Sequence, residues 1–376
     1  MEGEKTIQET VQNEIACSNC SAKLKFSPGT NSLKCEYCGT VNEIEISEEE
    51  IEEIDFDKFL NENDTSVEKQ EIVTIKCNSC GAETTLDPNI VSDSCAFCGS
   101  NIVLTDGTSC SIIKPKSLLP FIVDSKKAFT LFRTWIKKLW WAPSALKKFA
   151  KLNKKIAGMY IPFWTYDSNT TCQYRGQRGD NYTTTETYST VVNGKSVTKT
   201  RTVTRIRWRS ASGSVNNKFD DVLVVATTSL PKKYLEKLEP WDLDSLIPFD
   251  EKYLSGFRTE SYQVGIKEGF DDAKIKMTKE IKVTVKKDIG GDHQRISKMN
   301  TKYNDITFKH ILLPVWISAY KFKDKVYRFM INARTGEVQG ERPYSWIKIT
   351  LAVLAVLAII AAIVLVVQYY NGGEKY

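Results

Sequence analysis

Eight of the ten cysteines in this 376-residue chain fall into two copies of one spacing. In each copy, two cysteines separated by two residues are followed, after fourteen intervening residues, by a second such pair. The first copy consists of Cys17, Cys20, Cys35 and Cys38, and the second of Cys77, Cys80, Cys95 and Cys98. Four thiolates at this spacing suit one tetrahedral zinc ion, with iron in a rubredoxin-like site as the alternative. We therefore predict two metal sites, each binding one zinc ion.

Small residues after the cysteines and short strands between the pairs complete the pattern of a zinc ribbon. Ser21 directly follows Cys20, and three other cysteines are followed by glycine, namely by Gly39, Gly81 and Gly99. A glycine at this position allows a positive φ, which turns successive backbone N–H groups toward the sulfur. We expect residues 1–40 to form a first zinc ribbon and residues 72–105 a second. Because four protein ligands leave no position for water, we expect both sites to be structural.

Charge is distributed unevenly along the chain. The formal net charge is +6, but residues 41–71 contain thirteen acidic and two basic residues, a net of −11. The remainder therefore carries +17, which is +6 minus −11. Two interpretations of residues 41–71 remain open: a solvated acidic linker, or a docking segment that folds on a basic surface, which can belong to this protein itself.

The C-terminal region contains an uninterrupted apolar segment. Residues 349–367 have no charged side chain, and Trp346 and Tyr369 flank them as interfacial aromatic residues do. A helix over residues 346–368 reaches roughly 30 Å, which matches the hydrocarbon core of a bilayer. A buried core helix is the alternative, but a core helix of this length is rarely apolar on every face. We predict a transmembrane helix here.

The charges that flank the apolar segment predict its orientation. Arg328, Arg334, Arg342 and Lys348 precede it closely, whereas only Lys375 follows it. The positive-inside rule therefore places the large N-terminal region in the cytoplasm. Zinc-binding thiols favour the same side because they persist in reducing compartments. The N-terminus has no apolar stretch typical of a secretory signal, so we expect a single-pass, tail-anchored protein of the cell membrane.

Residues 106–159 are predicted to form a basic amphipathic helical segment. Residues 126–155 contain ten basic and no acidic residues. Asp124 can cap a helix over residues 125–140, and Ser144 can cap a second helix over residues 145–155. The first helix has an apolar stripe that favours packing on a domain; its basic residues can face anionic lipid head groups.

Residues 160–343 have the pattern of a β-rich, antiparallel α+β domain. The segment from Ile161 to Tyr166 is similar to the segment from Leu313 to Tyr320, which indicates two related strands. Asn193-Gly194 predicts a two-residue turn in a long hairpin, one face of which carries arginines. Short and long helices are expected near residues 231–238 and 261–286. The predicted fold class is therefore α+β: two small zinc ribbons, this domain and one transmembrane helix.

Motifs of common enzyme classes are missing. The chain has no phosphate-binding glycine loop, no nucleophile elbow and no zinc-protease motif, and it has only two histidines, His293 and His310. We expect both histidines to be packed or solvated, and Cys110 and Cys172 to be inert thiols. We therefore assign no catalytic residues and no binding site for an organic cofactor, and we expect that the protein is not an enzyme.

Several motifs together resemble bacterial membrane-anchored zinc-ribbon proteins. These are the cysteine pattern, the segments Tyr160–Asp167 and Leu313–Trp316, and the motifs Asn332–Val338 and Gly340–Ser345 that precede the terminal span. The ribbons are similar to those of transcription factor B-type proteins, and the resemblance covers nearly the whole chain. Relatives are often labelled primosomal or helicase-like, but this chain lacks the helicase nucleotide loop. Some relatives occur in phage-shock-type envelope-stress clusters, so the resemblance implies membrane docking of protein partners.

These observations lead to two functional hypotheses. The first is a non-enzymatic, cytosol-facing zinc-ribbon adaptor that docks protein partners at the lipid bilayer, in the envelope-stress response that the resemblance implies. The alternative is a nucleic-acid-binding zinc-ribbon protein tethered to the membrane, since an arginine-rich hairpin can follow a phosphate backbone. The acidic residues 41–71 oppose that alternative because they repel nucleic acid. Neither hypothesis involves a small-molecule substrate.

Overall fold

The structure is a computed structural model that describes most of the chain. The described residues are 15–45, 47, 49–61, 69–79, 81–85, 92–95, 97, 100–103, 108–144, 156–192, 195–322 and 325–372. They form a mixed α/β structure with one nine-stranded sheet, three small sheets and a separate C-terminal helix. The sequence prediction of mixed helices and sheets followed by an apolar C-terminal helix is confirmed at this level.

Three long strands form the centre of the nine-stranded sheet. β11 (Ala157–Val192) lies between β12 (Lys195–Val225) and β15 (His293–Phe322) and is antiparallel to both. The two similar segments noted in the sequence are direct partners here, because Ile161 pairs with Leu313. The remaining strands of this sheet are β4 (Ile54–Asp55), β10 (Ser117–Leu118), β13 (Ile247–Pro248), β14 (Arg258–Thr259), β16 (Lys325–Asn332) and β17 (Val338–Gly340).

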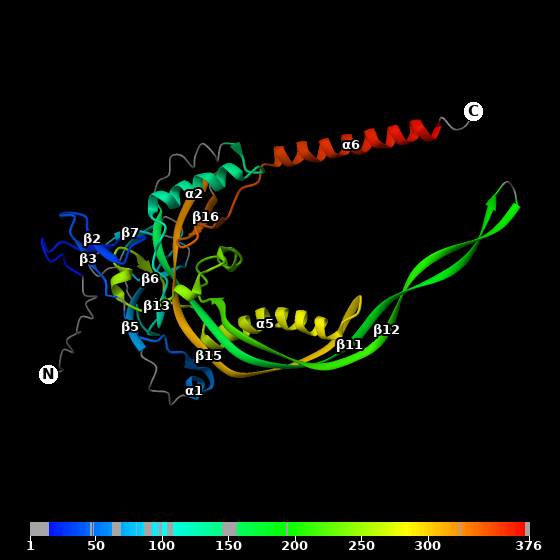
Figure 1. Cartoon of the computed structure of the whole chain (residues 1–376). Helices are drawn as coiled ribbons and strands as arrows, with labels where there is room; N and C mark the ends of the chain where they lie inside the picture. Colours follow the sequence, from blue (N-terminus) through cyan, green and yellow to red (C-terminus); the bar gives the residue numbers. More distant parts are fainter. Residues whose placement is uncertain are drawn as a thin grey trace.

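The hairpin of β11 and β12 extends far beyond the rest of the sheet (Figure 1). The strands remain paired up to Val192 and Lys195, so two residues connect them, as Asn193-Gly194 predicted. That pair itself lies outside the described residues. Pairing between β11 and β15 ends at Gly179 and His293. Residues 180–192 and 195–207 therefore form a two-stranded arm, and thirteen residues at about 3.3 Å each give it a length of roughly 40 Å.

Helix α5 (Ile266–Ile289) packs on the long strands where the arm begins (Figure 1). Its buried side chains recur every three or four residues, as expected for an amphipathic helix. They are Ile266, Phe270, Ala273, Met277, Ile281, Val285 and Ile289. Together with Trp164 and Tyr166 of β11 they form one of three apolar clusters.

Helix α2 (Ser125–Lys138) confirms the first predicted basic helix. Asp124 caps it by accepting a hydrogen bond from the backbone N–H of Lys127 at 2.7 Å. The apolar stripe is buried, and Phe132 stacks on Phe329 of β16 with ring centroids 3.6 Å apart. The stripe therefore packs on the protein itself, as favoured from the sequence. The second basic helix, predicted for residues 145–155, lies outside the described residues.

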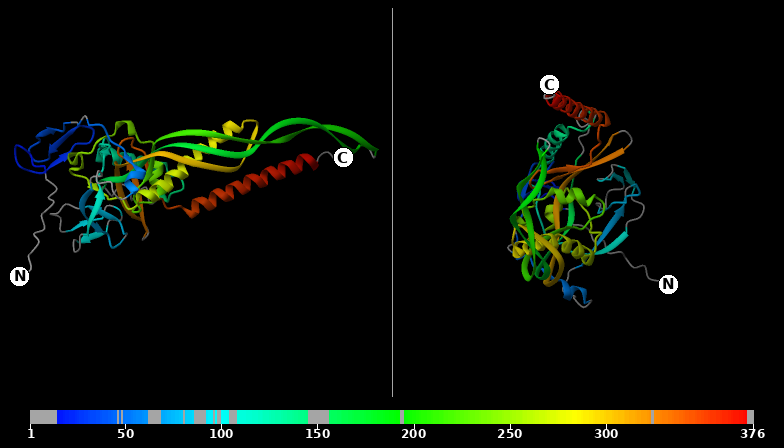
Figure 2. Two further views of the ribbon diagram at one scale, coloured as in Figure 1. Left: turned by 90° about the horizontal axis from the view of Figure 1, so that it is seen from below. Right: turned by 90° about the vertical axis from the view of Figure 1, so that its right-hand side faces the viewer.

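The two faces of the central sheet are covered by two different cysteine-containing parts of the chain. Side chains alternate between the faces of a strand, so Tyr160 and Met159 of β11 point to opposite sides. The face of Tyr160 packs against residues 15–45, which we call the first cysteine segment. The face of Met159 packs against residues 69–113, the second cysteine segment. Figure 2 shows these segments, in dark blue and in lighter blue to cyan, on opposite sides of the body.

Each cysteine segment is built from short antiparallel strands. The first contains β1 (Leu24–Phe26), β2 (Ser32–Cys35) and β3 (Val41–Glu43). The second contains β5 (Lys69–Lys76), β6 (Glu83–Thr85), β7 (Ser92–Ser94), β8 (Asn101–Val103) and β9 (Thr108–Ile113). The strand, turn and strand predicted between the cysteine pairs of the first segment are confirmed.

Part of the acidic residues 41–71 docks on the central sheet. β4 pairs with Thr307 and Phe308 of β15, and α1 (Phe56–Leu60) follows directly. Phe56 is buried, and its ring lies 4.9 Å from that of Phe270 on α5. Glu53 accepts a hydrogen bond from the Lys309 ammonium at 3.1 Å. For these residues, the docking interpretation describes the structure better than a solvated linker.

The motif Asn332–Val338 forms a tight turn after β16. The Asn332 side chain accepts hydrogen bonds from the N–H groups of Arg334 and Thr335 at 2.8 and 3.1 Å. Gly336 has a φ of +83°, which favours glycine. The guanidinium of Arg334 donates to Asp242 and, at 3.2 Å, to the carbonyl of Pro120. These contacts give Asn332–Val338 a structural role.

The chain between β12 and α5 is mostly irregular. It includes α4 (Lys232–Leu235) and the 3₁₀ turns Glu236–Leu238, Leu243–Ser245 and Glu251–Leu254.

A separate apolar helix ends the described chain. Helix α6 (Trp346–Gly372) makes no core contact, and residues 346–369 are long and apolar enough to span a membrane. Among the described residues it is the one helix with that property.

Candidate metal centre

The four cysteines of the first cysteine segment converge on one point. The Sγ atoms of Cys17 and Cys38 are 3.5 Å apart, those of Cys20 and Cys35 are 3.5 Å apart, and those of Cys20 and Cys38 are 3.4 Å apart. All four sulfurs lie within 4.8 Å of one another. Four sulfurs at about 2.3 Å from a tetrahedral zinc ion would be about 3.8 Å apart, so the cluster could hold a metal ion with little adjustment.

Backbone turns of one kind position these sulfurs. The N–H of Cys17 donates to the carbonyl of Ala22 at 2.8 Å, and the N–H of Cys35 donates to that of Thr40 at 2.9 Å. The residue after each pair has a positive φ: +56° at Ser21 and +75° at Gly39. Ser21, which departs from the glycine found at this place elsewhere in the pattern, therefore adopts the conformation that glycine favours.

Hydrogen bonds to the sulfurs favour thiolates. Backbone N–H groups of Asn19 and Cys20 lower the pKa of Cys17. The hydroxyl of Thr40, 3.0 Å from the sulfur, and its N–H lower the pKa of Cys38 to about 5. Such donors orient and stabilise metal-bound thiolates in structural sites. At Cys20 the N–H of Ala22 acts in the same direction, but side-chain hydrogen bonds with the sulfurs of Cys38 and Cys35 raise its pKa to about 12, because they favour the protonated thiol, which donates to Cys38.

The first cysteine segment is joined to the domain through backbone hydrogen bonds. The N–H of Phe26 donates to the carbonyl of Ser255 at 3.0 Å, and the hydroxyl of Ser255 donates to the carbonyl of Leu24 at 2.6 Å. The N–H of Gly29 donates to the carbonyl of Phe121 at 2.8 Å. Apolar contacts add to this, because the rings of Phe26 and Tyr253 are 5.1 Å apart. The cysteine cluster therefore lies on a surface that is continuous with the core.

The described half of the second cysteine segment repeats this geometry. The N–H groups of Cys77 and Cys95 donate to carbonyls five residues ahead, at 2.8 and 2.7 Å, as in the first segment. Gly81 has a φ of +74°. The hydroxyl of Ser100 lies 3.3 Å from the sulfur of Cys77, so the two cysteine turns face each other. Cys80 and Cys98, the other two predicted ligands, lie outside the described residues.

One equivalent position differs sharply between the segments. The aromatic residue just before the fourth cysteine is Tyr37 in the first segment and Phe97 in the second. Tyr37 is 84 % exposed, whereas Phe97 is 0 % exposed and packs in the apolar cluster of Leu119, Met159 and Ile161. The second segment thus uses its aromatic residue as an anchor, and the first presents it to solvent.

A group of carboxylates lies where the acidic residues meet β15. Glu53, Asp167 and Asp220 bring their oxygens within 4.8 Å of one another. The ammonium of Lys309 lies 3.1 Å from Glu53 and 2.7 Å from Asp221. Burial raises the pKa of Asp167 to about 7. Because the buried Lys309 pairs with Glu53 of this group and with the neighbouring Asp221, we interpret these contacts as a clamp between the acidic residues and the sheet. Sequence reasoning missed it because its members are far apart in the chain.

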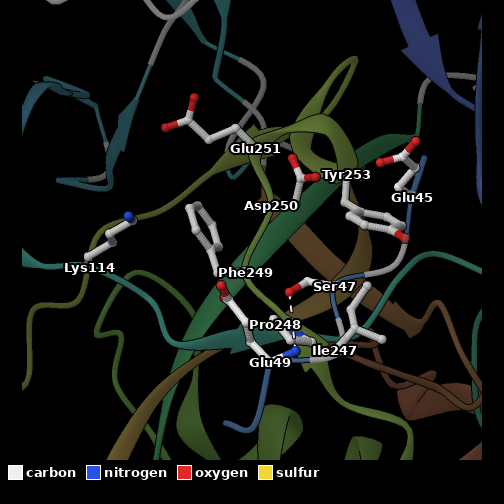
Figure 3. Close-up of a pocket in the computed structure, with 10 residues that line it drawn as sticks. All are labelled: Glu45, Ser47, Glu49, Lys114, Ile247, Pro248, Phe249, Asp250, Glu251 and Tyr253. Carbon is white, nitrogen blue, oxygen red and sulfur yellow. Dashed lines mark hydrogen bonds between the residues drawn. The ribbon is translucent and has the colours of Figure 1, made fainter. Parts of the chain in front are cut away.

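A surface pocket of about 360 Å³ adjoins the acidic residues (Figure 3). Carboxylates of Glu45, Glu49, Asp250 and Glu251 contribute to its lining, together with Lys114. None of its ten described lining residues is a histidine or a cysteine.

The other residues singled out in the sequence have packing roles. His310 is buried, its Nδ1 is 2.8 Å from the carbonyl of Ile113, and burial lowers its pKa to about 4. His293 is exposed and lies 3.0 Å from Asn181. Cys172 is buried in the cluster around α5. The side chain of Cys110 lies outside the described part of the structure.

The beginning of α6 is attached to the end of α2. The N–H of Ser345 donates to the carbonyl of Trp141 at 2.8 Å. The ammonium of Lys348 donates to the carbonyls of Trp140 and Ala142 at 3.1 and 2.8 Å. These three hydrogen bonds fix the first turn of the apolar helix to the body of the protein, which sequence reasoning did not predict.

Comparison with known proteins gives one clear relative. The chain is similar to YdjG, an uncharacterized protein of Bacillus subtilis (strain 168), with 29 % identity over 336 residues. The similarity covers 89 % of this chain and 91 % of the relative. No family model matches the chain, and no solved structure matches it. The similarity therefore extends over most of both chains, and the relative's name assigns no function.

Proposed function

We propose that this protein is a non-enzymatic adaptor that is anchored in the membrane by α6 and docks protein partners through its first cysteine segment. The observation that carries the proposal is the exposed Tyr37 beside a closed thiolate cluster, on a chain with a helix able to span a bilayer. An exposed aromatic residue on a rigid turn is a common binding anchor, because little conformational entropy is lost when it is buried.

The proposed role of the metal is structural. Each cysteine segment would be a zinc ribbon, with Cys17, Cys20, Cys35 and Cys38 holding one ion and Cys77, Cys80, Cys95 and Cys98 holding the second. Thiolate ligands, the sulfur spacing of the first cluster and the N–H donors around it all suit zinc. Four protein ligands leave no open coordination position, so the ion would brace the binding surface rather than take part in chemistry.

The proposed topology places the body in the cytoplasm. Arg328, Arg334, Arg342 and Lys348 lie on the side of α6 that is joined to the body, which fits the positive-inside rule. Zinc-bound thiols also require a reducing compartment. The resemblance to membrane-anchored zinc-ribbon proteins of envelope-stress clusters supports a membrane-associated protein as the partner.

Site-specific photo-crosslinking tests the proposed surface. A photo-reactive phenylalanine analogue is placed at position 37 of the full chain in native membranes, and at position 188 as the control. Tyr188 is also an exposed aromatic residue, but it lies on the arm. We expect a discrete crosslinked protein from position 37 that is lost when Cys17→Ser/Cys35→Ser is added. The same crosslinks from both positions, or none from position 37, would refute the proposal.

Nucleic-acid binding by the arm is the second candidate. Residues 178–209 carry seven basic and two acidic residues. Several of these charges are already engaged, because Arg201 and Arg205 pair with Glu186, and Arg207 lies over the ring of Tyr182. Titration of the full chain in detergent with DNA and RNA across salt concentrations distinguishes the candidates: binding that weakens steeply with salt supports the arm, and no binding at low salt removes it.

A further inference from the structure

An exposed group of aromatic and basic side chains surrounds the point where α6 leaves the body. We call this group the collar and define it by Lys137, Lys138, Trp140, Trp141, Arg342 and Tyr344. Trp140 is 74 % exposed, and Trp141 and Tyr344 are also exposed. Lys137 and Lys138 form the last turn of α2, whose inner stripe is buried. The collar therefore points away from the core and is not explained by packing of the domain.

The collar is held at a fixed position relative to the start of α6. The three hydrogen bonds from Ser345 and Lys348 join the first turn of α6 to the backbone of residues 140–142. Trp346, the first residue of α6, is 79 % exposed, as a residue at a membrane interface would be in the absence of lipid. If the apolar helix enters a bilayer at Trp346, the collar lies at the depth of the lipid head groups.

The chemistry of the collar suits an anionic lipid surface. Indole and phenol rings prefer the boundary between hydrocarbon and water, where one end of the ring is apolar and the other polar. Lysine and arginine close to a bilayer are attracted by negatively charged head groups. Residues 125–144 contain five basic and no acidic residues, and the guanidinium of Arg342 stacks over the ring of Tyr344.

We propose that the collar binds anionic phospholipid head groups of the leaflet that α6 enters, and so holds the body against the membrane. This rests on the proposed anchoring by α6, but it adds a second, separate contact with lipid. The anchor fixes where the body joins the bilayer, and the collar adds a second contact that fixes which side of the body faces the bilayer. Because α6 is hydrogen-bonded to the residues that follow α2, and α2 packs on the sheet, the two lipid contacts would also fix the orientation of the sheet relative to the membrane.

Hydroxyl-radical footprinting of the full chain in vesicles tests the collar. The protein is reconstituted with its body outside, in phosphatidylcholine alone or in phosphatidylcholine mixed with phosphatidylglycerol. The oxidation rates of Trp140, Trp346 and Tyr37 are each normalised to the rate in the urea-unfolded chain. In the mixed vesicles we expect Trp140 and Trp346 to be oxidised roughly fivefold more slowly, and Tyr37 to remain reactive.

A charge variant tests the contribution of the head groups. Lys138→Gln/Arg342→Gln is expected to reduce the protection of Trp140 in mixed vesicles to its value in phosphatidylcholine alone. Lys126→Gln/Lys127→Gln, at the other end of α2, is the matched control and is expected to leave the protection unchanged. Equal protection in the collar variant and in the wild type would overturn the proposed binding of anionic head groups.

The outcomes separate the collar from the anchor. If Trp346 is protected and Trp140 is not, the collar is refuted while the anchor stands. If neither is protected, the anchor is refuted and the collar with it. Protection of Trp140 that disappears when the protein is diluted in lipid would assign the surface to contact between copies of the chain, and would also overturn the proposal.

Discussion

The first and second cysteine segments share their spacing and backbone turns but use one equivalent aromatic residue in opposite ways. They cover opposite faces of the same sheet, and each contributes two buried cysteines to the adjacent core. Phe97 is inserted into that core, whereas Tyr37 faces solvent. Two segments with the same cysteine spacing can therefore differ in role. In one the aromatic residue packs in the core, and in the other the equivalent residue is exposed to solvent.

Removing the ligands is expected to have the largest effect. On the proposed assignment of one zinc ion to each segment, Cys77→Ser/Cys95→Ser and Cys17→Ser/Cys35→Ser should each lose one zinc ion and destabilise the protein by on the order of 5 kcal/mol, because metal binding contributes directly to folding of small modules. We expect the larger loss for the second segment, since its collapse also releases Phe97. Metal content by mass spectrometry and thermal unfolding measure this. A Cys77/Cys95 variant that still holds two metal ions would contradict a second site.

Substitutions of Phe97 and Tyr37 give the most direct test of the difference between the two cysteine segments. Phe97→Ala leaves a cavity in a well-packed core and is expected to cost about 3–5 kcal/mol. Tyr37→Ala removes an exposed ring and should change the free energy of unfolding by about 0.5 kcal/mol or less. Denaturant unfolding of the full chain in detergent compares the two variants. Equal losses would show that Tyr37 also packs, and would remove the distinction between the segments.

The face of the second segment also holds a buried carboxyl whose titration should be measurable. Glu260 is 1 % exposed, it accepts a hydrogen bond from Thr227 at 2.7 Å, and burial raises its pKa to about 7, with Glu83 of β6 adding to the effect. The folded state therefore binds this proton more tightly than the unfolded state. Its contribution to stability is present at low pH and is lost as the pH rises through about 7.

Glu260→Gln should remove this pH dependence. Relative to the variant, the free energy of unfolding of the wild type is expected to fall by up to about 3 kcal/mol between about pH 5 and about pH 8, since one pKa unit corresponds to about 1.4 kcal/mol. Using the difference between the two proteins cancels the opposite trend from His310, whose lowered pKa weakens the fold in acid. A difference that stays constant with pH would show that Glu260 titrates normally.

The smallest expected effect concerns the turn residue in which the segments differ. Ser21→Gly should stabilise the protein by about 1 kcal/mol, because Ser21 has a φ of +56° and glycine adopts it without strain. Gly81→Ser, at the equivalent turn of the second segment, should destabilise by a similar amount, since no atom lies within 4 Å of an added Cβ and backbone strain alone acts. Differential scanning calorimetry resolves both shifts. Stabilisation by Gly81→Ser would refute the equivalence of the turns.

Features with a local cause could be predicted from the sequence. Cysteine spacing predicted the cluster of Cys17, Cys20, Cys35 and Cys38 because four ligands within one small module meet without help from the rest of the fold. Asp124 predicted the start of α2, and Asn193-Gly194 predicted the hairpin, because capping and turn geometry depend on a few neighbouring residues. The apolar α6 was equally clear, since its composition alone distinguishes it.

Features that depend on distant residues could not be predicted. The pairing of Ile54 with Phe308, and the ion pair of Glu53 with Lys309, join parts of the chain with no shared local signal. The spacing of the cysteines is the same in both segments, so it could not tell which segment buries its aromatic residue. The length of β11 was not predicted either: the strand runs from Ala157 to Val192 through an irregularity between Tyr166 and Ser168.

Both cysteine segments precede β11 and β15 in the chain, although they cover the faces of these strands. During synthesis from the N-terminus, both cysteine segments leave the ribosome before the first long strand does. Each apolar face then meets part of its cover as it emerges, which shortens the time in which bare strand edges and faces can aggregate. With each segment binding a metal ion as proposed, the supply of metal to the nascent chain should determine how much protein reaches the folded state, in addition to how long it survives there.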